Sequence, residues 1–166
     1  MTIISDAILG FQDLIGRVPE LVQPLVVAAA GAVPFIEGEG AASIGIIGGI
    51  HPVVAGLAGA IGNFVCVALL VLLGTGVRSA ITGRSEAKRT TPRREKFQRA
   101  FTRYGVPGVS LLGPLLLPTH FTAVMLAGAG VGRGRILLWQ GVAIALWTTV
   151  LTVIVGLAVS GATRAG

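Results

Sequence analysis

Two carboxylates and one histidine are the residues of this sequence that could do chemistry inside an apolar setting. Glu37 and Glu39 are the only acids within its apolar stretches, and His120 lies in a later stretch of the same kind. An ionised carboxylate is costly in hydrocarbon, so such a group is a functional candidate by default. An apolar setting favours the neutral acid, which lets the group exchange protons. We expect Glu37, nearer to Pro34, to be the inner group; the alternative is a solvated, inert loop at residues 37–40.

Polar residues around His120 extend this candidate site. Thr119 and Thr122 flank the histidine, and their hydroxyls could bond a substrate or backbone carbonyls freed at a turn. If this turn meets the one that carries Glu37, the carboxylate and the imidazole would form a titratable pair. The alternative is that His120 only packs, which is the more frequent role of a single histidine.

Four further residues are expected along a substrate path: Pro34, Pro118, Asn63 and Gln140. The two prolines mark turns, where the backbone frees polar groups. The two amides lie on predicted membrane spans. There, hydrogen bonding between helices is the more frequent role of such side chains.

Enzyme signatures are absent from the sequence. It contains no GxSxG, HExxH or P-loop pattern and no Ser-His-Asp set. Cys66 is the single cysteine, which excludes an intrachain disulfide and a Cys/His zinc pattern. We therefore expect no catalysis, no metal and no organic cofactor, and Cys66 is expected to be a small core residue.

The composition predicts a membrane protein. Of 166 residues, 53% are hydrophobic and 12% are charged, and the mean hydropathy is +0.85, far outside the range of a soluble domain. Of the runs that lack Asp, Glu, Lys and Arg, two are expected to cross the bilayer outright. We expect one membrane domain over residues 1–166. The four runs cover residues 21–36, 40–77, 104–132 and 136–163.

Positive charge is concentrated between residues 78 and 103. Nine of the thirteen Lys and Arg lie there, and Arg133 and Arg135 follow. The positive-inside rule assigns such a segment to the cytoplasm. No nucleic-acid-binding module accompanies it, so we expect membrane lipids as partners and no nucleic acid. Contact with anionic lipid headgroups is compatible with this assignment.

Two amphipathic helices are predicted, one in each half of the chain. Apolar residues recur at helical spacing over residues 5–17, which predicts a short helix that lies at the membrane interface. Within the basic segment, Thr91 is a predicted N-cap and Pro92 the first residue of a second such helix, which runs to residue 104. A similar order of residue types recurs in the two halves of the chain, with loosely matching spacing. We infer an internal repeat.

Length and proline content predict a re-entrant hairpin in each half. A single helix over residues 104–132 would be about 44 Å long at about 1.5 Å per residue, too long for a hydrocarbon core of about 30 Å. Three prolines interrupt it, and we expect the turn near residues 118–120. In the first half, a turn at residues 34–40 separates expected arms at 21–33 and 41–50. Acids and glycines there disfavour a lipid-facing helix.

Full spans are predicted after the hairpins, at residues 53–76 and 136–160. Each half then crosses once, so the halves have opposite orientations, as in the inverted-topology repeats of secondary transporters. The predicted fold is an all-α integral membrane protein. Its repeats cover residues 5–77 and 92–161, joined by a basic cytoplasmic loop at 78–91. Each repeat comprises an amphipathic helix, a re-entrant hairpin and a transmembrane helix; the alternative is four ordinary transmembrane helices.

Several short motifs lie between residues 20 and 161: Pro34-Phe35-Ile36-Glu37, Gly59-Ala60-Ile61-Gly62-Asn63, Leu73-Gly74-Thr75-Gly76, Tyr104-Gly105 through Pro118 to Ala127-Gly128, and Ala145-Leu146-Trp147 with Gly156 and Gly161. Together they resemble the DedA superfamily and its relatives, the small multidrug-export proteins. The resemblance implies two re-entrant hairpins that face each other in the bilayer. It also implies proton-dependent export or the movement of lipid-linked molecules between leaflets.

The resemblance is uneven between the hairpins. In DedA proteins the first hairpin carries a Pro-rich motif that ends in an acid, which Pro34 and Glu37 match. The second carries arginines around a proline, which this chain lacks. Pro118-Thr119 is closer to the turn of the small multidrug-export branch.

We therefore expect a proton-coupled transporter of a small or lipid-like substrate, in which substrate and proton compete for the hairpin turns. The alternatives are a scramblase or flippase for phospholipids or lipid carriers, and a membrane scaffold that transports nothing. The expected location is the cell membrane, multi-pass, in a prokaryotic inner membrane, with residues 78–103 in the cytoplasm. Glycine-rich helix faces are compatible with a homodimer.

Overall fold

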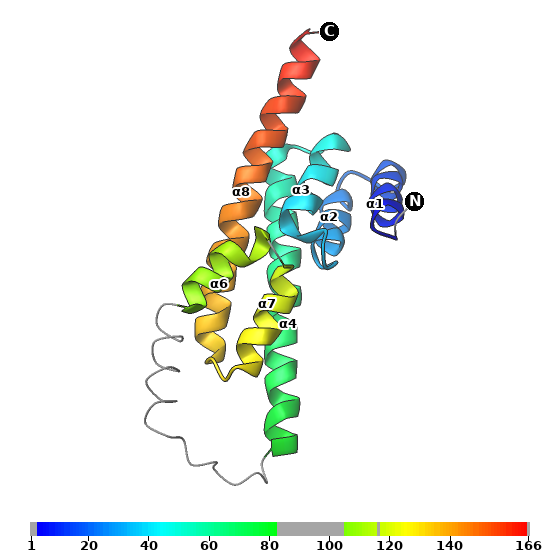
Figure 1. Cartoon of the computed structure of the whole chain (residues 1–166). Coiled ribbons are helices and arrows are strands. Elements are labelled where there is room, and N and C mark those ends of the chain that lie inside the picture. The colour runs from blue at the N-terminus through cyan, green and yellow to red at the C-terminus, as the bar shows by residue number, and fades with distance from the viewer. Residues whose placement is uncertain (1–2, 83–104, 116, 166) are drawn as a thin grey trace. The chain divides into compact units, whose positions relative to one another are not determined.

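The computed structural model describes residues 3–82, 105–115 and 117–165, and all regular elements in these ranges are helical (Figure 1). The all-α prediction is confirmed for them. The predicted amphipathic helix at 92–104 lies outside the described residues, as does most of the predicted loop at 78–91. The elements are α1 (Ile3–Arg17), α2 (Gln23–Gly31), α3 (Glu37–Ile47), α4 (Pro52–Thr82), α6 (Val106–Leu112), the 3-10 turn η2 (Gly113–Leu115), α7 (Thr119–Gly128) and α8 (Arg133–Ala165).

The chain divides into two compact units. Unit 1 comprises Met1–Cys66 and Ile144–Gly166, and unit 2 comprises Val67–Ala143. Unit 1 therefore contains α1, α2 and α3 with the beginning of α4 and the end of α8. Unit 2 contains α6, η2 and α7 with the end of α4 and the beginning of α8. Each unit combines a packed pair of short helices, α2 with α3 or α6 with α7, with opposite portions of the two long ones, and unit 1 also contains α1.

Within the described residues, α4 and α8 are the helices long and apolar enough to cross a membrane. Their apolar stretches are Pro52–Gly74 and Arg133–Arg164, which include nearly all of the two predicted spans. Proline is absent from both interiors. Pro52 is the first residue of α4, a position where no backbone N–H is needed. The backbone N–H of Val53 donates to Nδ1 of His51 at 3.3 Å, which satisfies one free amide at this helix start.

In unit 1, α2 and α3 pack against each other as a helical hairpin. The chain reverses over residues 32–36, where Phe35 has a φ of 72° and Glu37 follows with 55°. Both lie in the left-handed region, which side-chain-bearing residues rarely adopt. The predicted turn at 34–40 was too long, because residues 37–40 form the first turn of α3. Carboxylates are favoured at a helix N-terminus, which explains why this acidic segment is helical.

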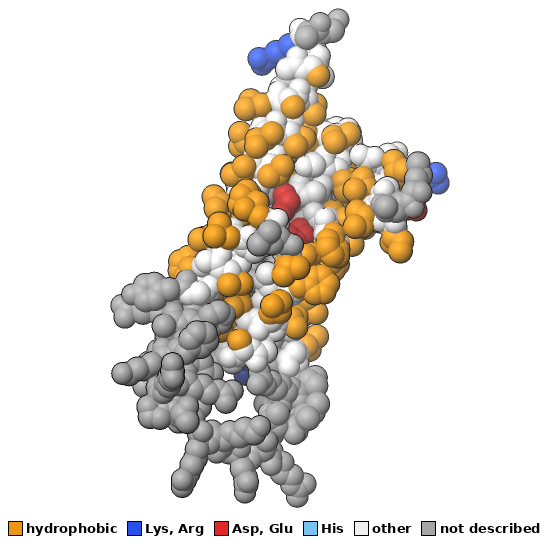
Figure 2. Space-filling view, viewed as in Figure 1, with side chains coloured by type: hydrophobic (Ala, Val, Ile, Leu, Met, Phe, Trp, Pro, Cys, Tyr) orange, Lys and Arg blue, Asp and Glu red, His pale blue; other side chains and the backbone are white. Residues whose placement is uncertain are grey.

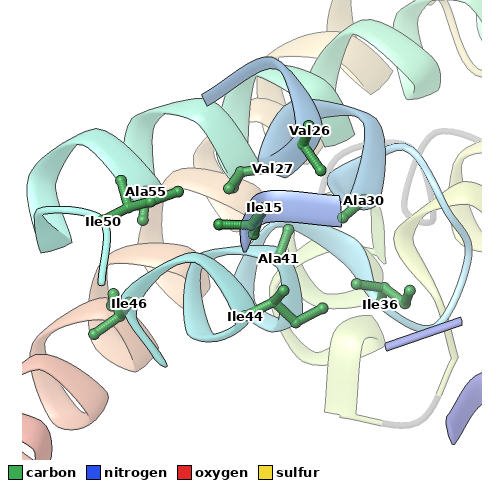
Figure 3. Close-up of a cluster of buried hydrophobic side chains, with 10 residues drawn as sticks. All are labelled: Ile15, Val26, Val27, Ala30, Ile36, Ala41, Ile44, Ile46, Ile50 and Ala55. Carbon is green, nitrogen blue, oxygen red and sulfur yellow. The ribbon is translucent and has the colours of Figure 1, made fainter. Parts of the chain in front are cut away.

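The core of unit 1 joins α1, the hairpin and the beginning of α4 (Figure 3). The amphipathic helix predicted at 5–17 is present as α1, and it lies alongside the hairpin. At its C-terminal end, Nε2 of Gln23 donates to the carbonyl oxygen of Ile15 at 3.2 Å. At its N-terminal end, Ile3, Ile4 and Ala7 line an apolar groove with residues 33–36. The core residues are Ile15, Val26, Val27, Ala30, Ile36, Ala41, Ile44, Ile46, Ile50 and Ala55.

Glycines allow α4 to approach both arms of the hairpin. A Cβ atom built on Gly59 would lie 2.6 Å from the carbonyl oxygen of Gly38 in α3, and one built on Gly62 would overlap the carbonyl group of Ala28 in α2. Gly31 meets α4 in the same way, because its Cβ would overlap the carbonyl oxygen of Gly59. The small-residue face of the first span therefore packs against the hairpin.

The beginning of α4 and the end of α8 run antiparallel within unit 1. A Cβ built on Gly156 would lie 3.4 Å from Cβ of Pro52, and one built on Gly56 would lie 2.8 Å from Oγ1 of Thr152. Four residues forward along α4 correspond to four residues back along α8. This is one contact per helical turn on each helix.

In unit 2, α6 and α7 also pack against each other. Pro118 is extended, with a φ of −53° and a ψ of 143°. Its carbonyl oxygen accepts hydrogen bonds from the N–H groups of Phe121 and Thr122, at 3.0 and 3.1 Å. Thr119 and His120, expected in the turn, therefore form the first turn of α7. A Cβ built on Gly113 would lie 2.9 Å from Cγ2 of Thr122, so η2 packs closely on α7.

Candidate functional site

The predicted acids of unit 1 lie together at the start of α3. Glu37 is buried, with 4% of its surface exposed, whereas Glu39 is half-buried. Pro34 is exposed on the preceding turn. Burying a carboxylate without compensation is unfavourable, and the free N–H groups of a helix N-terminus are one source of compensation. We call residues 37–39 the acidic turn.

The acidic turn packs between α4 and α8 of unit 1. A Cβ built on Gly38 would lie 3.3 Å from Cα of Ala60 and would overlap Oγ1 of Thr148. Because residue 38 is a glycine, the acidic turn approaches the backbone of α4 at Ala60 and the side chain of Thr148 on α8. Asn63 is fully buried one turn further along α4, and its backbone nitrogen lies 3.2 Å from a Cβ built on Gly31.

Unit 2 buries a second set of polar side chains. Nε2 of Gln140 donates to Oγ1 of Thr122 at 2.9 Å, and this hydroxyl donates to the carbonyl oxygen of Thr119 at 3.0 Å. Because the hydroxyl proton is directed at Thr119, the Gln140 amide must present its nitrogen to Thr122. The carboxamide oxygen of Gln140 then faces elsewhere and has no hydrogen-bond partner among the described residues. His120 is buried beside this network, with 3% exposed.

The structure thus keeps the predicted site residues in two sets. The proposed pairing of Glu37 with His120 joins residues of different units and stays a prediction. Unit 1 holds Pro34, Glu37, Glu39 and Asn63, and unit 2 holds Pro118, Thr119, His120, Thr122 and Gln140.

Three buried hydroxyl-bearing residues were missed from the sequence: Ser110, Thr148 and Thr152. Their hydroxyl oxygens are buried and have no hydrogen-bond partner among the described residues. Thr148 and Thr152 are one helical turn apart on α8. Two hydroxyls at this spacing lie on the same face of an apolar helix, so the sequence could have indicated them as a pair. Ser110 lies one turn before Gly113, the residue that contacts Thr122.

The buried hydroxyl and amide groups could form hydrogen bonds with a ligand, and the acidic turn could also neutralise a cation. In the part of the chain that the structure describes, no three His, Cys, Asp or Glu residues are grouped so that they could hold a metal ion. No family model matches the chain, and neither a curated protein nor a solved structure matches it. The resemblance to DedA proteins therefore rests on the short motifs and stays a prediction.

Proposed function

We propose that this protein is a membrane transporter that exports a small or lipid-like substrate and couples this export to proton exchange at Glu37. The observation that carries the proposal is the burial of Glu37, 4% exposed, in a turn packed between two long apolar helices. An ionised carboxylate is costly in hydrocarbon, so a carboxyl group in such a place is a functional candidate, at which a proton and a ligand would compete. Competition between the two is the simplest form of coupling.

Surface exposure of the long helices supports a membrane location. Only 33% of the most apolar stretch of α4 and 17% of that of α8 is buried within the protein, whereas a core helix of a soluble protein is buried over most of its surface. Hydrophobic side chains cover much of the visible surface of the described part, and acidic side chains lie among them (Figure 2). Lipid would cover this surface in a bilayer.

The packing of the hairpin on α4 supports a location of Glu37 deep in the bilayer. Ala55 contacts Gly45 near the end of α3, and Ala60 contacts Gly38 near its start, so α3 runs antiparallel to α4. Ala60 lies about 12 Å along the helix axis from Pro52 at about 1.5 Å per residue. Half of a hydrocarbon core of about 30 Å is about 15 Å. If α4 enters the bilayer at Pro52, the acidic turn therefore lies close to the midplane.

The short helices of the hairpin support re-entry. α2 has 9 residues and α3 has 11, which correspond to about 14 and about 17 Å. Neither spans a core of about 30 Å. Because α1 lies alongside this hairpin, α1 would enter the bilayer together with the hairpin. The ion pair between Asp13 and Arg17 would then lie at the outer end of α1. Asp6 is exposed nearer the acidic turn and would need water there.

The composition of the two units supports an inverted repeat. Each unit contains one packed pair of short helices, to which unit 1 adds α1, and the beginning of one long helix accompanies the end of the other. The contacts in unit 1 show the long helices antiparallel there. Two antiparallel spans, each preceded by a short helical pair, are the arrangement that places substrate sites near the midplane of secondary transporters. The hydroxyls and amide of unit 2 would then serve the substrate path.

The test is proton flux into liposomes that contain a pH-sensitive dye. Wild type, Glu37→Gln and Glu39→Gln are compared while cationic drugs and soluble lipid-linked precursors are added in turn. We expect a substrate-dependent proton signal that Glu37→Gln abolishes. Glu20→Gln is the matched control, because Glu20 is exposed between α1 and α2. A signal that survives in Glu37→Gln would refute proton exchange at this residue, and lipid movement without any proton signal would favour the scramblase.

A further inference from the structure

Two threonine hydroxyls of α8 are buried in unit 1 and lack a hydrogen-bond partner among the described residues, those of Thr148 and Thr152. Two other hydroxyls on the same helix bond to their own backbone. Oγ of Ser160 donates to the carbonyl oxygen of Gly156 at 2.6 Å, and Oγ1 of Thr163 donates to that of Val159 at 3.2 Å. An unsatisfied buried hydroxyl is destabilising, so the orientation of Thr148 and Thr152 requires a reason.

Each of these hydroxyls faces a glycine on a neighbouring helix. Thr148 meets Gly38 in the acidic turn, where a built Cβ would overlap Oγ1, and Thr152 meets Gly56 on α4, where it would lie 2.8 Å from Oγ1. We call these two contacts the threonine seam. A side chain at either glycine would require the facing threonine side chain to move. The seam therefore holds α3, α4 and α8 together without hydrogen bonds from its hydroxyls.

Both sides of the seam are in unfavourable conformations. On the hairpin side, Phe35 and Glu37 have left-handed backbones, which are strained for residues with a side chain. On the α8 side, a rotation about χ1 would let each hydroxyl bond to the carbonyl oxygen four residues earlier, as Ser160 and Thr163 do. A pocket of about 290 Å³ lies along the seam and is lined in part by Gly56, Ala60, Thr148 and Thr152.

We propose that the threonine seam is the closed state of a gate that controls access to Glu37, with Thr148 and Thr152 as its positioning residues. Release of the acidic turn relieves the left-handed strain, and the freed hydroxyls bond to their own helix. Apolar packing across the seam opposes release. The value of such a gate for transport rests on the proposed function of Glu37, but opening itself can be measured without transport.

The first test measures how fast a water-soluble thiol reagent reaches position 37. Glu37→Cys is made in a Cys66→Ala background, reconstituted in vesicles and treated with a charged methanethiosulfonate. Adding Thr148→Val replaces the unpartnered hydroxyl with a methyl group of similar size. This stabilises the closed state, so labelling should slow by roughly fivefold or more. Thr163→Val is the matched control and should leave the rate unchanged, because that hydroxyl is exposed and bonds to its own backbone.

The direction in which Thr148→Val changes the labelling rate at position 37 distinguishes a gate from a purely structural role. If Thr148 made a stabilising hydrogen bond, Thr148→Val would loosen the packing and speed labelling. Faster labelling, or an unchanged rate, would overturn the gate. Thr148→Ser, which keeps the hydroxyl, should label as fast as the parent or faster.

The second test locks the seam covalently. A Cβ built on Gly56 would lie 3.5 Å from Cβ of Thr152, within the range of about 3.5–4.5 Å that a disulfide needs. In the double variant Gly56→Cys/Thr152→Cys, also without Cys66, oxidation should abolish the substrate-dependent proton signal, and a reductant should restore it. Full transport by the oxidised protein would overturn the gate. If no variant gives a proton signal, the proposed function fails, and labelling at position 37 decides the gate by itself.

Discussion

Replacing Gly62 by alanine should destabilise the protein measurably, although alanine is the better helix former. The added methyl group would overlap the carbonyl group of Ala28. A backbone carbonyl cannot rotate aside as a side chain can, so α2 and α4 must separate. Overpacking of this kind costs up to about 3 kcal/mol, and the higher helix propensity of alanine offsets about 1 kcal/mol. The expected net loss is about 2 kcal/mol.

Thermal unfolding of the purified protein in detergent measures this loss. For a chain of this size, about 2 kcal/mol corresponds to a melting temperature lower by about 4–8 °C. The matched control is Gly74→Ala on the same helix, where a built Cβ meets nothing within 4 Å. That variant gains propensity without strain and should melt about 2–4 °C higher than the parent. If both variants shift alike, or Gly62→Ala is as stable as the parent, the close contact of α4 with α2 is refuted.

Two further substitutions test the turn and the polar network. Gln140→Leu removes one hydrogen bond to Thr122 and also one unpartnered carboxamide oxygen, so stability should stay within about 1 kcal/mol of the parent. If Gln140 serves the substrate path, the proton signal in liposomes should nevertheless fall, whereas a large drop in melting temperature would indicate a structural role. Phe35→Gly should stabilise the fold by about 1 kcal/mol, because glycine adopts the left-handed backbone without strain. A lower melting temperature would contradict the turn geometry.

The positions of the helices were largely predictable, because proline placement and apolar run length determine them. The amphipathic stretch at 5–17 is α1, and the long runs after each hairpin are α4 and α8. The first helical turns of α3 and α7 were assigned to loops, since each follows a proline and Glu37 adjoins Gly38. The first turn of α3 is helical here because α4 and α8 pack closely on Gly38, which propensity alone does not reveal.

Contacts between elements were less predictable than the elements themselves. The sequence indicated the small-residue face of α4, since Gly59 and Gly62 recur at helical spacing. It did not indicate that Gly38 would meet Thr148, because the two residues are far apart in the chain. A threonine in an apolar helix is normally expected to bond to its own backbone. Only the packing shows that Thr148 and Thr152 do otherwise.

The departures from local rules in unit 1 converge on one place. A buried acid, two left-handed residues and the unpartnered hydroxyl of Thr148 lie in or against the turn that carries Glu37, and the unpartnered hydroxyl of Thr152 lies one helical turn further along α8. Elsewhere in unit 1, Ala41, Ile44 and Ala55 form an ordinary close-packed apolar core. Proteins depart from such rules mainly where function requires it. Because the left-handed backbone and the unpartnered hydroxyl of Thr148 weaken the same contact from both of its sides, a movable acidic turn explains these two departures together.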